Sequence, residues 1–238
     1  MALSQLEPQL IWKNFSALNA VPRPSKKEEK VIEFIKNFGE NLGLETTVDE
    51  VGNVIIKKPA TAGMEDRKSV VLQSHLDMVH QKNNDVNFDF DTQGIQMEID
   101  GDWVKAKGTT LGADNGLGVA AIMSILESND IPHPALEALF TIDEETGMTG
   151  AMGLKPGQLN GEILLNLDTE EDDEIDIGCA GGIDVTATQN YGLENARGQI
   201  VKIEVKGLQG GHSGMDIIKG FGNSTVIFGR LLYTGLYN

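Results

Sequence analysis

The sequence predicts an α/β fold with a mostly parallel sheet and flanking helices, followed by the start of a smaller α+β domain. Three observations support this fold class. Apolar runs of strand length are separated by a helical segment, which is the pattern of βαβ units. Several of these runs end in histidine or acidic residues, as strands do when their carboxyl ends form a binding site. Toward the end of the chain, two segments alternate polar and apolar residues, which is typical of half-solvated strands.

Two helices are predicted before the first strand. Apolar residues recur at helical spacing between Leu3 and Leu18, ahead of two prolines that end the segment. The second helix begins with a capping-box pattern of Ser25 and Glu28, and Gly43 is its expected C′ residue. Its apolar face consists of Val31, Ile32, Ile35, Phe38 and Leu42.

Four strands and one buried helix are predicted next. The strands are expected at 54–57, 69–73, 136–142 and 162–167, and the helix at 116–126. The last two strands are largely apolar, so we expect both to be buried.

The sequence changes in character toward its end. The segments 183–189 and 199–206 are predicted as half-solvated strands, and 223–237 as a helix. We therefore assign residues 1–182 to a first domain and 183–238 to the beginning of a second. A segment of about fifty residues is too small to hold a stable core by itself, so the second domain is expected to be incomplete.

The composition excludes several classes of function. A formal net charge of -17 opposes binding to nucleic acid phosphates. No apolar run approaches the roughly 20 residues of a membrane span, and the first residues lack the pattern of a secretory signal. The one cysteine, Cys179, excludes an intramolecular disulfide and fits a cytoplasmic location. Its place among glycines favours a small structural residue over a nucleophile.

A histidine and an aspartate close one of the predicted strands. His75 and Asp77 are two residues apart, so on a strand their side chains face the same way. The Asp77 carboxylate could then accept the imidazole N–H and leave the other nitrogen free for a metal. The alternative is a polar strand end that binds nothing.

Three further acidic positions follow the same pattern. Asp114 lies in a glycine-rich segment ahead of the buried helix, where a helix cap is the alternative to a metal ligand. Glu144 and Glu145 close one buried strand and Asp168 closes the next. Neighbouring carboxylates repel unless they share a cation or a proton, although a solvated acidic loop is the alternative for the pair. The later acids at 170–174 are interpreted as solvated charge.

The motifs that contain these residues resemble a known family. They are HLDMV at 75–79, GADNG at 112–116, DEETG at 143–147, LD at 167–168 and GGHSG at 210–214. Together they are similar to the di-zinc metallopeptidases that include aminoacylase, carboxypeptidase G and tripeptidase T. The segments GTTLGADNG at 108–116 and GCAGG at 178–182 look most like the aminoacyl-histidine dipeptidase branch, which cleaves Xaa-His dipeptides such as carnosine.

The resemblance implies a zinc exopeptidase-like catalytic domain followed by a lid, and a role for each candidate residue. His75 and Asp168 would bind one zinc ion, Glu145 would bind the other, and Asp114 would bridge them. Two other implied roles concern protons and orientation: Glu144 would be the general base toward a water between the metals, and Asp77 would orient His75. His212 would polarise the scissile carbonyl or stabilise the oxyanion, although without the family it reads as a histidine in a glycine turn. Manganese or cobalt could replace zinc at such mixed sites.

The length departs from the family pattern. Family members are roughly twice as long, and a histidine near their C-terminus completes the second zinc site, so the chain looks truncated at its C-terminal end. The expected function is metal-dependent hydrolysis of a dipeptide, with a small peptide as partner and a homodimer possible. The alternatives are deacylation of N-acyl amino acids and an inactive metal-binding remnant.

Overall fold

A computed structural model of the chain describes residues 3–169, 173–179, 181–183, 185–195, 197–212, 214 and 216–237. The predicted solvated acids Glu170, Glu171 and Asp172 lie outside these residues. The chain divides into two compact units, Met1–Asp176 and Ile177–Asn238, each described by itself below. The predicted domain boundary between 182 and 183 stays a prediction.

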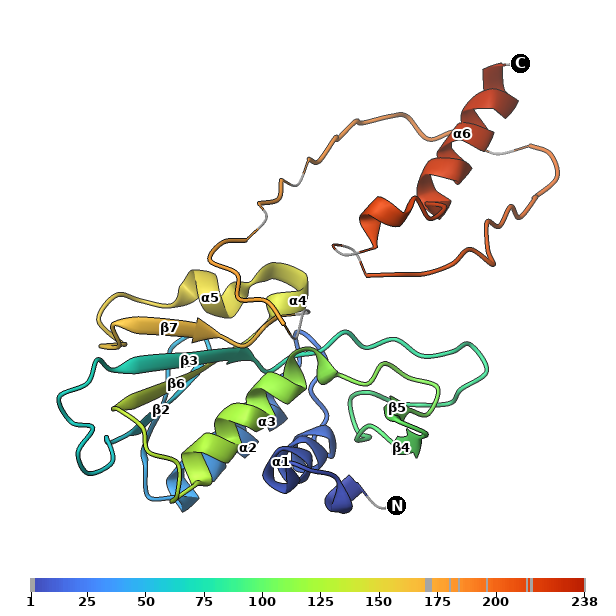
Figure 1. Ribbon diagram of the computed structural model, residues 1–238. Coiled ribbons are helices and arrows are strands. Elements are labelled where there is room, and N and C mark those ends of the chain that lie inside the picture. Colours follow the sequence, from blue (N-terminus) through green and yellow to red (C-terminus); the bar gives the residue numbers. More distant parts are fainter. Residues whose placement is uncertain are drawn as a thin grey trace. The chain divides into compact units, whose positions relative to one another are not determined.

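The first unit contains a five-stranded sheet in the order β1-β2-β6-β3-β7 (Figure 1). The strands are β1 (Glu45–Val48), β2 (Val54–Lys58), β3 (Val70–His75), β6 (Leu136–Thr141) and β7 (Ile163–Asn166). β3 pairs in parallel with both β6 and β7, whereas β1 with β2 and β2 with β6 are antiparallel. The α/β class is therefore confirmed, but the sheet is mixed, not mostly parallel.

A tight turn explains the antiparallel pairing of β1 with β2. The Asp49 carboxylate oxygen Oδ1 accepts hydrogen bonds from the backbone N–H groups of residues 51–53, at 2.8 to 3.0 Å. This turn reverses the chain between β1 and β2, because an aspartate that binds the following N–H groups stabilises a tight turn. The short connection makes the two strands antiparallel neighbours.

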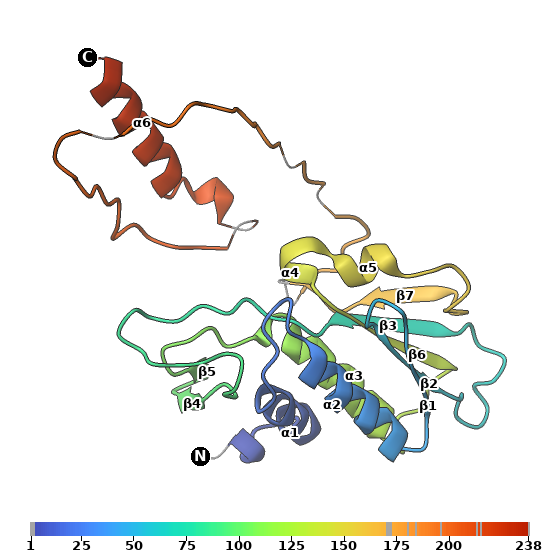
Figure 2. The same ribbon diagram turned by 180° about the vertical axis from the view of Figure 1, so that it is seen from behind.

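Three long helices lie on one side of this sheet, as both views of the ribbon show (Figures 1 and 2). They are α1 (Gln9–Asn19), α2 (Glu29–Asn41) and α3 (Ala113–Glu127). The shorter α4 (Glu144–Gly147) and α5 (Thr149–Gly153) lie on the other side. Alternate residues of the strands face the two sides, so Ile56 and Phe140 belong to the main core and Ile55 and Leu139 to a smaller cluster.

The first predicted helix is divided. A short 3₁₀ turn, η1 (Leu3–Gln5), precedes α1, which begins only after Pro8. Proline disfavours the helical conformation of the residue before it, so the apolar spacing continues across a break in the backbone. Gly43 is the C′ residue of α2 and has a φ of 70°, as predicted.

The predicted capping box does not form. The N-cap of α2 is Glu28 and makes no side-chain capping hydrogen bond. The Ser25 hydroxyl instead donates to the Asp77 carboxylate at 2.8 Å. Tertiary contacts with the loop after β3 have thus taken the place of the local capping interaction.

A two-stranded sheet, β4 (Met97–Asp100) and β5 (Trp103–Ala106), forms an antiparallel hairpin that the sequence reading did not identify.

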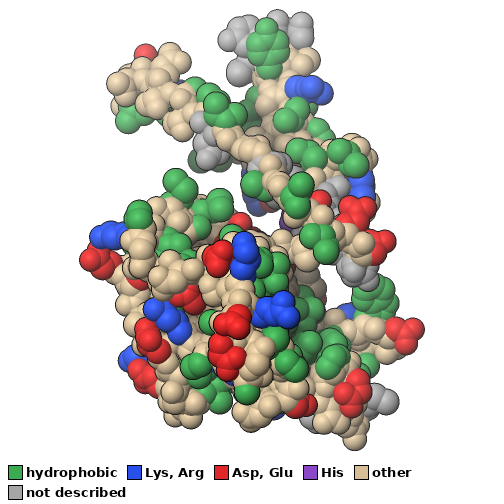
Figure 3. Space-filling view, turned by 60° about the vertical axis from the view of Figure 1, so that its left-hand side comes forward, with side chains coloured by type: hydrophobic (Ala, Val, Ile, Leu, Met, Phe, Trp, Pro, Cys, Tyr) green, Lys and Arg blue, Asp and Glu red, His purple; other side chains and the backbone are tan. Residues whose placement is uncertain are grey.

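Acidic and basic side chains are interspersed on the face of the molecule in Figure 3. Exposed ion pairs such as Lys68 with Glu162 and Lys107 with Glu98 accompany this mixture. No helix among the described residues is both long and apolar enough to cross a membrane.

The second unit contains the predicted C-terminal helix but not the predicted strands. The helix is α6 (Ser224–Tyr237), preceded by the 3₁₀ turn η2 (Ile217–Lys219). The described residues of 183–189 and 199–206 form no strand. Alternation of polar and apolar residues yields a strand only where a partner supplies the ladder hydrogen bonds, and an isolated hairpin is marginally stable at best.

Candidate metal centre

The candidate site lies where the parallel strands of the first unit end. His75 is the last residue of β3, Glu144 and Glu145 begin α4 just after β6, and Asp168 follows β7. Because the carboxyl ends of parallel strands meet at the same edge of a sheet, these side chains converge. Asp114 reaches the same place from the first turn of α3.

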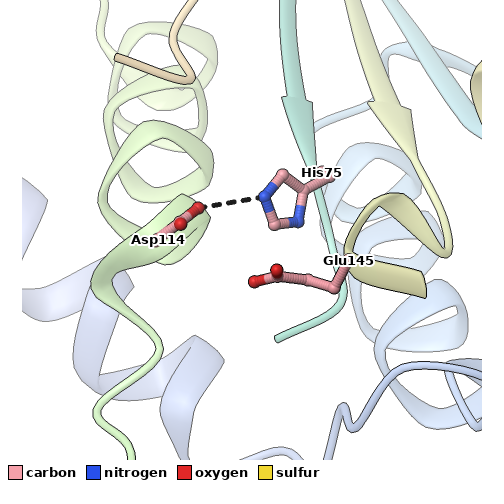
Figure 4. A group of neighbouring side chains, drawn as sticks. All are labelled: His75, Asp114 and Glu145. Carbon is pink, nitrogen blue, oxygen red and sulfur yellow. Dashed lines mark hydrogen bonds and ion pairs between the residues drawn. The ribbon is translucent and has the colours of Figure 1, made fainter. Parts of the chain in front are cut away.

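Four carboxylates that could bind a metal surround the imidazole of His75. Its Nε2 atom is 3.1 Å from Asp114 Oδ1, 3.8 Å from Asp168 Oδ1 and 3.9 Å from Glu144 Oε2. Figure 4 shows Asp114 and Glu145 pointing toward this ring from two different elements. The ligand atoms of His75, Asp114 and Glu145 lie within 4.8 Å of one another, as do those of His75, Glu144 and Asp168.

The two nitrogens of His75 face different carboxylates. Nδ1 is 3.3 Å from Asp77 Oδ1 and 3.1 Å from the Asp77 carbonyl oxygen, so it carries a proton, because neither oxygen can donate one. Burial would lower the pKa of His75, but its hydrogen bonds to Asp114 and Asp77 raise that pKa to about 10. The metal-free ring is therefore an imidazolium, and a metal would take the place of the Nε2 proton.

Asp77 connects the histidine with the turn after β6. Its buried carboxylate accepts the backbone N–H groups of Glu144 and Glu145, at 3.0 and 3.2 Å. Burial would raise the pKa of Asp77, but hydrogen bonds from His75, the Glu144 N–H and Ser25 lower it to about 2. One ionised carboxylate thus orients the imidazole and holds the two glutamates.

The remaining acids are destabilised in their charged form. Burial, followed by repulsion from neighbouring carboxylates, raises the pKa of Glu144, Glu145 and Asp168. The charge of His75 opposes this rise only in part. Several carboxylates that repel one another around one histidine are a donor set that a divalent cation neutralises. The chemistry of the donors and their separations therefore fit one or two metal ions.

The start of α3 has an unusual backbone. The Asp114–Asn115 peptide bond is cis. The Asn115 side chain, 4% exposed, donates from Nδ2 to the Leu167 carbonyl at 3.0 Å and to Asp168 Oδ1 at 2.9 Å. Asn115 therefore connects Asp114 to the end of β7, a contact that the sequence reading missed.

The turn between β6 and α4 is held by side chains around Asp143. Its carboxylate forms an ion pair with Lys26 at 2.8 Å and accepts hydrogen bonds from the hydroxyls of Thr146 and Thr149. Asp143 also forms a buried acidic group with Glu28 and Asp77. The sequence reading assigned Glu28 to a helix cap, and nothing local distinguishes that role from this one.

His212 belongs to the second unit. Its backbone N–H donates to Asp216 Oδ2 at 2.7 Å, and its Nδ1 accepts the Gly214 N–H at 3.2 Å. The neighbouring Ser213 lies outside the described residues. The catalytic role implied for His212 stays a prediction, as do the separate metal-binding and catalytic roles of the residues in the first unit.

Comparisons with known proteins confirm the resemblance. The chain is 50% identical over 232 residues to the cytosol non-specific dipeptidase of Escherichia coli. The match covers 97% of this chain and 48% of that protein. The crystal structure of aminoacylhistidine dipeptidase from Vibrio alginolyticus matches 98% of this chain and 48% of its own, at 46% identity and a TM-score of 0.75. No protein-family model matches the chain.

A more distant structure supports the fold alone. The crystal structure of a tripeptidase from Staphylococcus aureus is 23% identical, with a TM-score of 0.59 over 69% of this chain and 44% of its own. The chain spans about half the length of the dipeptidases it matches.

Proposed function

We propose that this chain carries the catalytic site of a metal-dependent dipeptidase that hydrolyses small dipeptides, Xaa-His among them. The observation that carries the proposal is the presence of two groups of potential metal ligands that share His75. In each group the ligand atoms lie within 4.8 Å of one another, beside the ends of three strands. The names of the two relatives, a cytosol non-specific dipeptidase and an aminoacylhistidine dipeptidase, support the same reaction.

Two zinc ions are the proposed metals, with manganese or cobalt as substitutes. We assign His75 and Asp168 to one ion, Glu145 to the other, and Asp114 to both. This assignment supplies three protein ligands to the first ion and, among the described residues, two to the second. Catalytic zinc usually has three protein ligands, so the second ion should bind more weakly and turnover by this chain should be low.

Glu144 is the proposed general base. When bound, divalent ions activate water near neutral pH and polarise the scissile carbonyl. The Glu144 carboxylate accepts a proton from the attacking water and then donates it to the leaving amine. His212 is proposed to polarise the carbonyl.

Asp77 is proposed to support both metal binding by His75 and the positions of Glu144 and Glu145. Its hydrogen bond with Nδ1 keeps Nε2 of His75 directed at the metal, and its hydrogen bonds from two backbone N–H groups hold the glutamates.

We further propose a cytoplasmic location, which the name of the Escherichia coli relative supports. A homodimer remains our prediction, and light scattering of the purified chain tests it.

The test is an assay of the purified chain with zinc, manganese or cobalt. We expect hydrolysis of β-alanyl-histidine or another dipeptide that is abolished by a chelator and restored by metal. Faster hydrolysis of N-acetyl amino acids would favour a deacylase instead. Bound metal without turnover of either substrate class would favour a metal-binding remnant and contradict the proposal.

A further inference from the structure

The connection between α1 and α2, residues 20–28, contacts all the ligand-bearing segments around the candidate site except the one after β7. We call it the α1–α2 connector. Its backbone bridges to the segment after β3, where Pro24 pairs with Met78 and the Ser25 N–H donates to the Met78 carbonyl. None of its residues is a metal ligand in the proposed function. Its side chains nevertheless account for many of the buried contacts beneath the ligands.

Arg23 joins two of these segments. Its side chain is 1% exposed, and its Nη1 atom donates to the carbonyl oxygens of Leu76 and Asp77, at 3.0 and 3.1 Å. Its Nη2 atom donates to the carbonyl oxygen of Gly112, at 2.5 Å, and to Asn19 Oδ1, at 3.0 Å. One rigid guanidinium therefore spans from the end of β3 to the turn before Asp114.

Two glycines near Asp114 make room for this side chain. A Cβ atom on Gly112 would lie 2.5 Å from Arg23 Nη2, and one on Gly116 would lie 2.6 Å from the same atom. Gly112 also has a φ of 72°, which favours glycine. The glycine-rich sequence around Asp114 is thus complementary to a buried arginine as well as to the ligand it carries.

Lys26 and Glu28 hold the turn that carries the two glutamates. The Lys26 ammonium is 2.8 Å from Asp143 Oδ2, and Glu28 Oε1 accepts the backbone N–H groups of Asp143 and Lys26, at 3.2 and 2.9 Å. Lys26, Asp143 and Met148 are the residues other than glycine with positive φ among those that the structure describes. Two of the three form this ion pair and the third ends α4, so the strained backbone gathers at the glutamate turn.

We infer that the α1–α2 connector positions the metal site, with Arg23 setting His75 against Asp114 and Lys26 with Glu28 setting Glu144 and Glu145. The inference rests on the proposed metal site and deepens it. These are positioning residues, because they contact the backbone and side chains of the ligand segments and no ligand position itself. A purely structural connector would affect folding and leave the folded site unchanged.

The first test substitutes Arg23→Lys, which keeps the charge but has one nitrogen where two are needed to span the segments. Co²⁺ is titrated into the full chain, and circular dichroism verifies folding. We expect the dissociation constant for Co²⁺ to rise about 10- to 100-fold, as when groups that orient metal ligands are removed. Arg67→Lys is the matched control on an exposed arginine and should leave the constant unchanged.

The second test substitutes Lys26→Met, with Lys13→Met as its control. Both lysines form 2.8 Å ion pairs and both side chains are 61% exposed, but Lys13 pairs with Glu127 away from the ligand segments. In Lys26→Met we expect the second equivalent of Co²⁺ to bind about tenfold more weakly. We also expect kcat to fall more than KM changes, and Lys26→Arg to restore both.

The outcomes separate this inference from the proposed function. A parent chain that binds Co²⁺ without cleaving any dipeptide contradicts the function, while the Co²⁺ titrations still decide the inference. Arg23→Lys and Lys26→Met proteins that bind Co²⁺ like their controls overturn the inference even if the parent is active. If Arg23→Lys does not fold, the Lys26 variants decide, because that side chain is largely exposed.

Discussion

β6 and β7 are both largely apolar but have very different surroundings. Both are apolar, both run parallel to β3, and both lead to acidic residues of the candidate site. All six residues of β6 are buried, because β2 and β3 flank it, whereas all four residues of β7 are exposed at the edge of the sheet. We expected two buried strands, and the expectation for the strand at 162–167 was wrong.

The difference shows what an apolar run indicates. It indicates a strand whose apolar side chains can be buried on both faces of a sheet. Whether they are buried depends on the position of the strand in the sheet, at an edge or between two other strands. Leu139 of β6 is 4% exposed and Leu164 of β7 is 61% exposed. The two side chains share one face of the sheet, since Leu164 is in register with Val71, which packs with Leu139.

The largest predicted effect contrasts the acids that follow the two strands. Glu144→Gln, after β6, should retain its metals and lose about 10²- to 10⁴-fold in dipeptide hydrolysis, because it removes the general base. Asp168→Asn, after β7, should instead lose metal. Metal content per chain and turnover are measured together on both variants.

The exposed Glu40→Gln is the control for the same change away from the site. Equal loss of metal from Glu144→Gln and Asp168→Asn would contradict this division of roles.

The next prediction makes the same substitution in both strands. Leu139→Ala should lower the free energy of unfolding by about 2 to 5 kcal/mol, because it leaves a cavity in a packed cluster. Leu164→Ala should lower it by less than about 1 kcal/mol, since that side chain is already largely solvated. Urea unfolding of the metal-free proteins measures both, and similar losses would mean that β7 is covered in solution.

The turns after the two strands should differ less. Asp143→Ala removes the acceptor of Lys26, Thr146 and Thr149 and places alanine at a φ of 51°, so we expect a loss of about 1 to 3 kcal/mol. Asn166→Ala removes the acceptor of the Asp168 N–H and an exposed hydrogen bond to Gln73 Oε1, and should cost about 1 kcal/mol. Thermal unfolding ranks the two, and the reverse order would show that the turn after β7 is the more tightly held.

The last prediction concerns β3, which lies between β6 and β7 in the sheet. The pKa of His75 is raised to about 10 in the fold, so protonation of this residue stabilises the metal-free protein. The stabilisation is complete at a pH below the unfolded pKa of about 6.5. That contribution should be lost as the pH rises through about 10, so the unfolding free energy in chelator should decline over this range. His75→Gln should flatten the decline, and a matched His80→Gln change in an exposed loop should not.

Much of the fold followed from local pattern. The positions of α2, α3, β2, β3 and β6 agree closely with the apolar periodicity, because a helix or strand with one covered face repeats its apolar residues at a fixed interval. The candidate residues could be named for a similar reason. Strand ends are visible in sequence, and charged residues directly after an apolar run stand out.

Other features depended on contacts between distant residues. Sheet order placed β7 at an edge, and the pairing of β2 with the distant β6 made the sheet mixed. Ser25 and Glu28 match a helix cap in sequence yet contact Asp77 and Asp143, which are more than fifty residues away along the chain. Arg23 carries no local signal at all, because only the assembled fold buries it between two carbonyl-bearing segments.

The sequence by itself therefore determined the α/β class, the main elements and the residues capable of binding metal, since these depend on residue type and short-range spacing. Only the tertiary structure decided which strand is covered, how His75 is shared between Asp77 and Asp114, and which loop supports the ligands. Burial, register and the partners of a charged group are set by residues far apart in the chain, and a pattern along the sequence does not contain those distances.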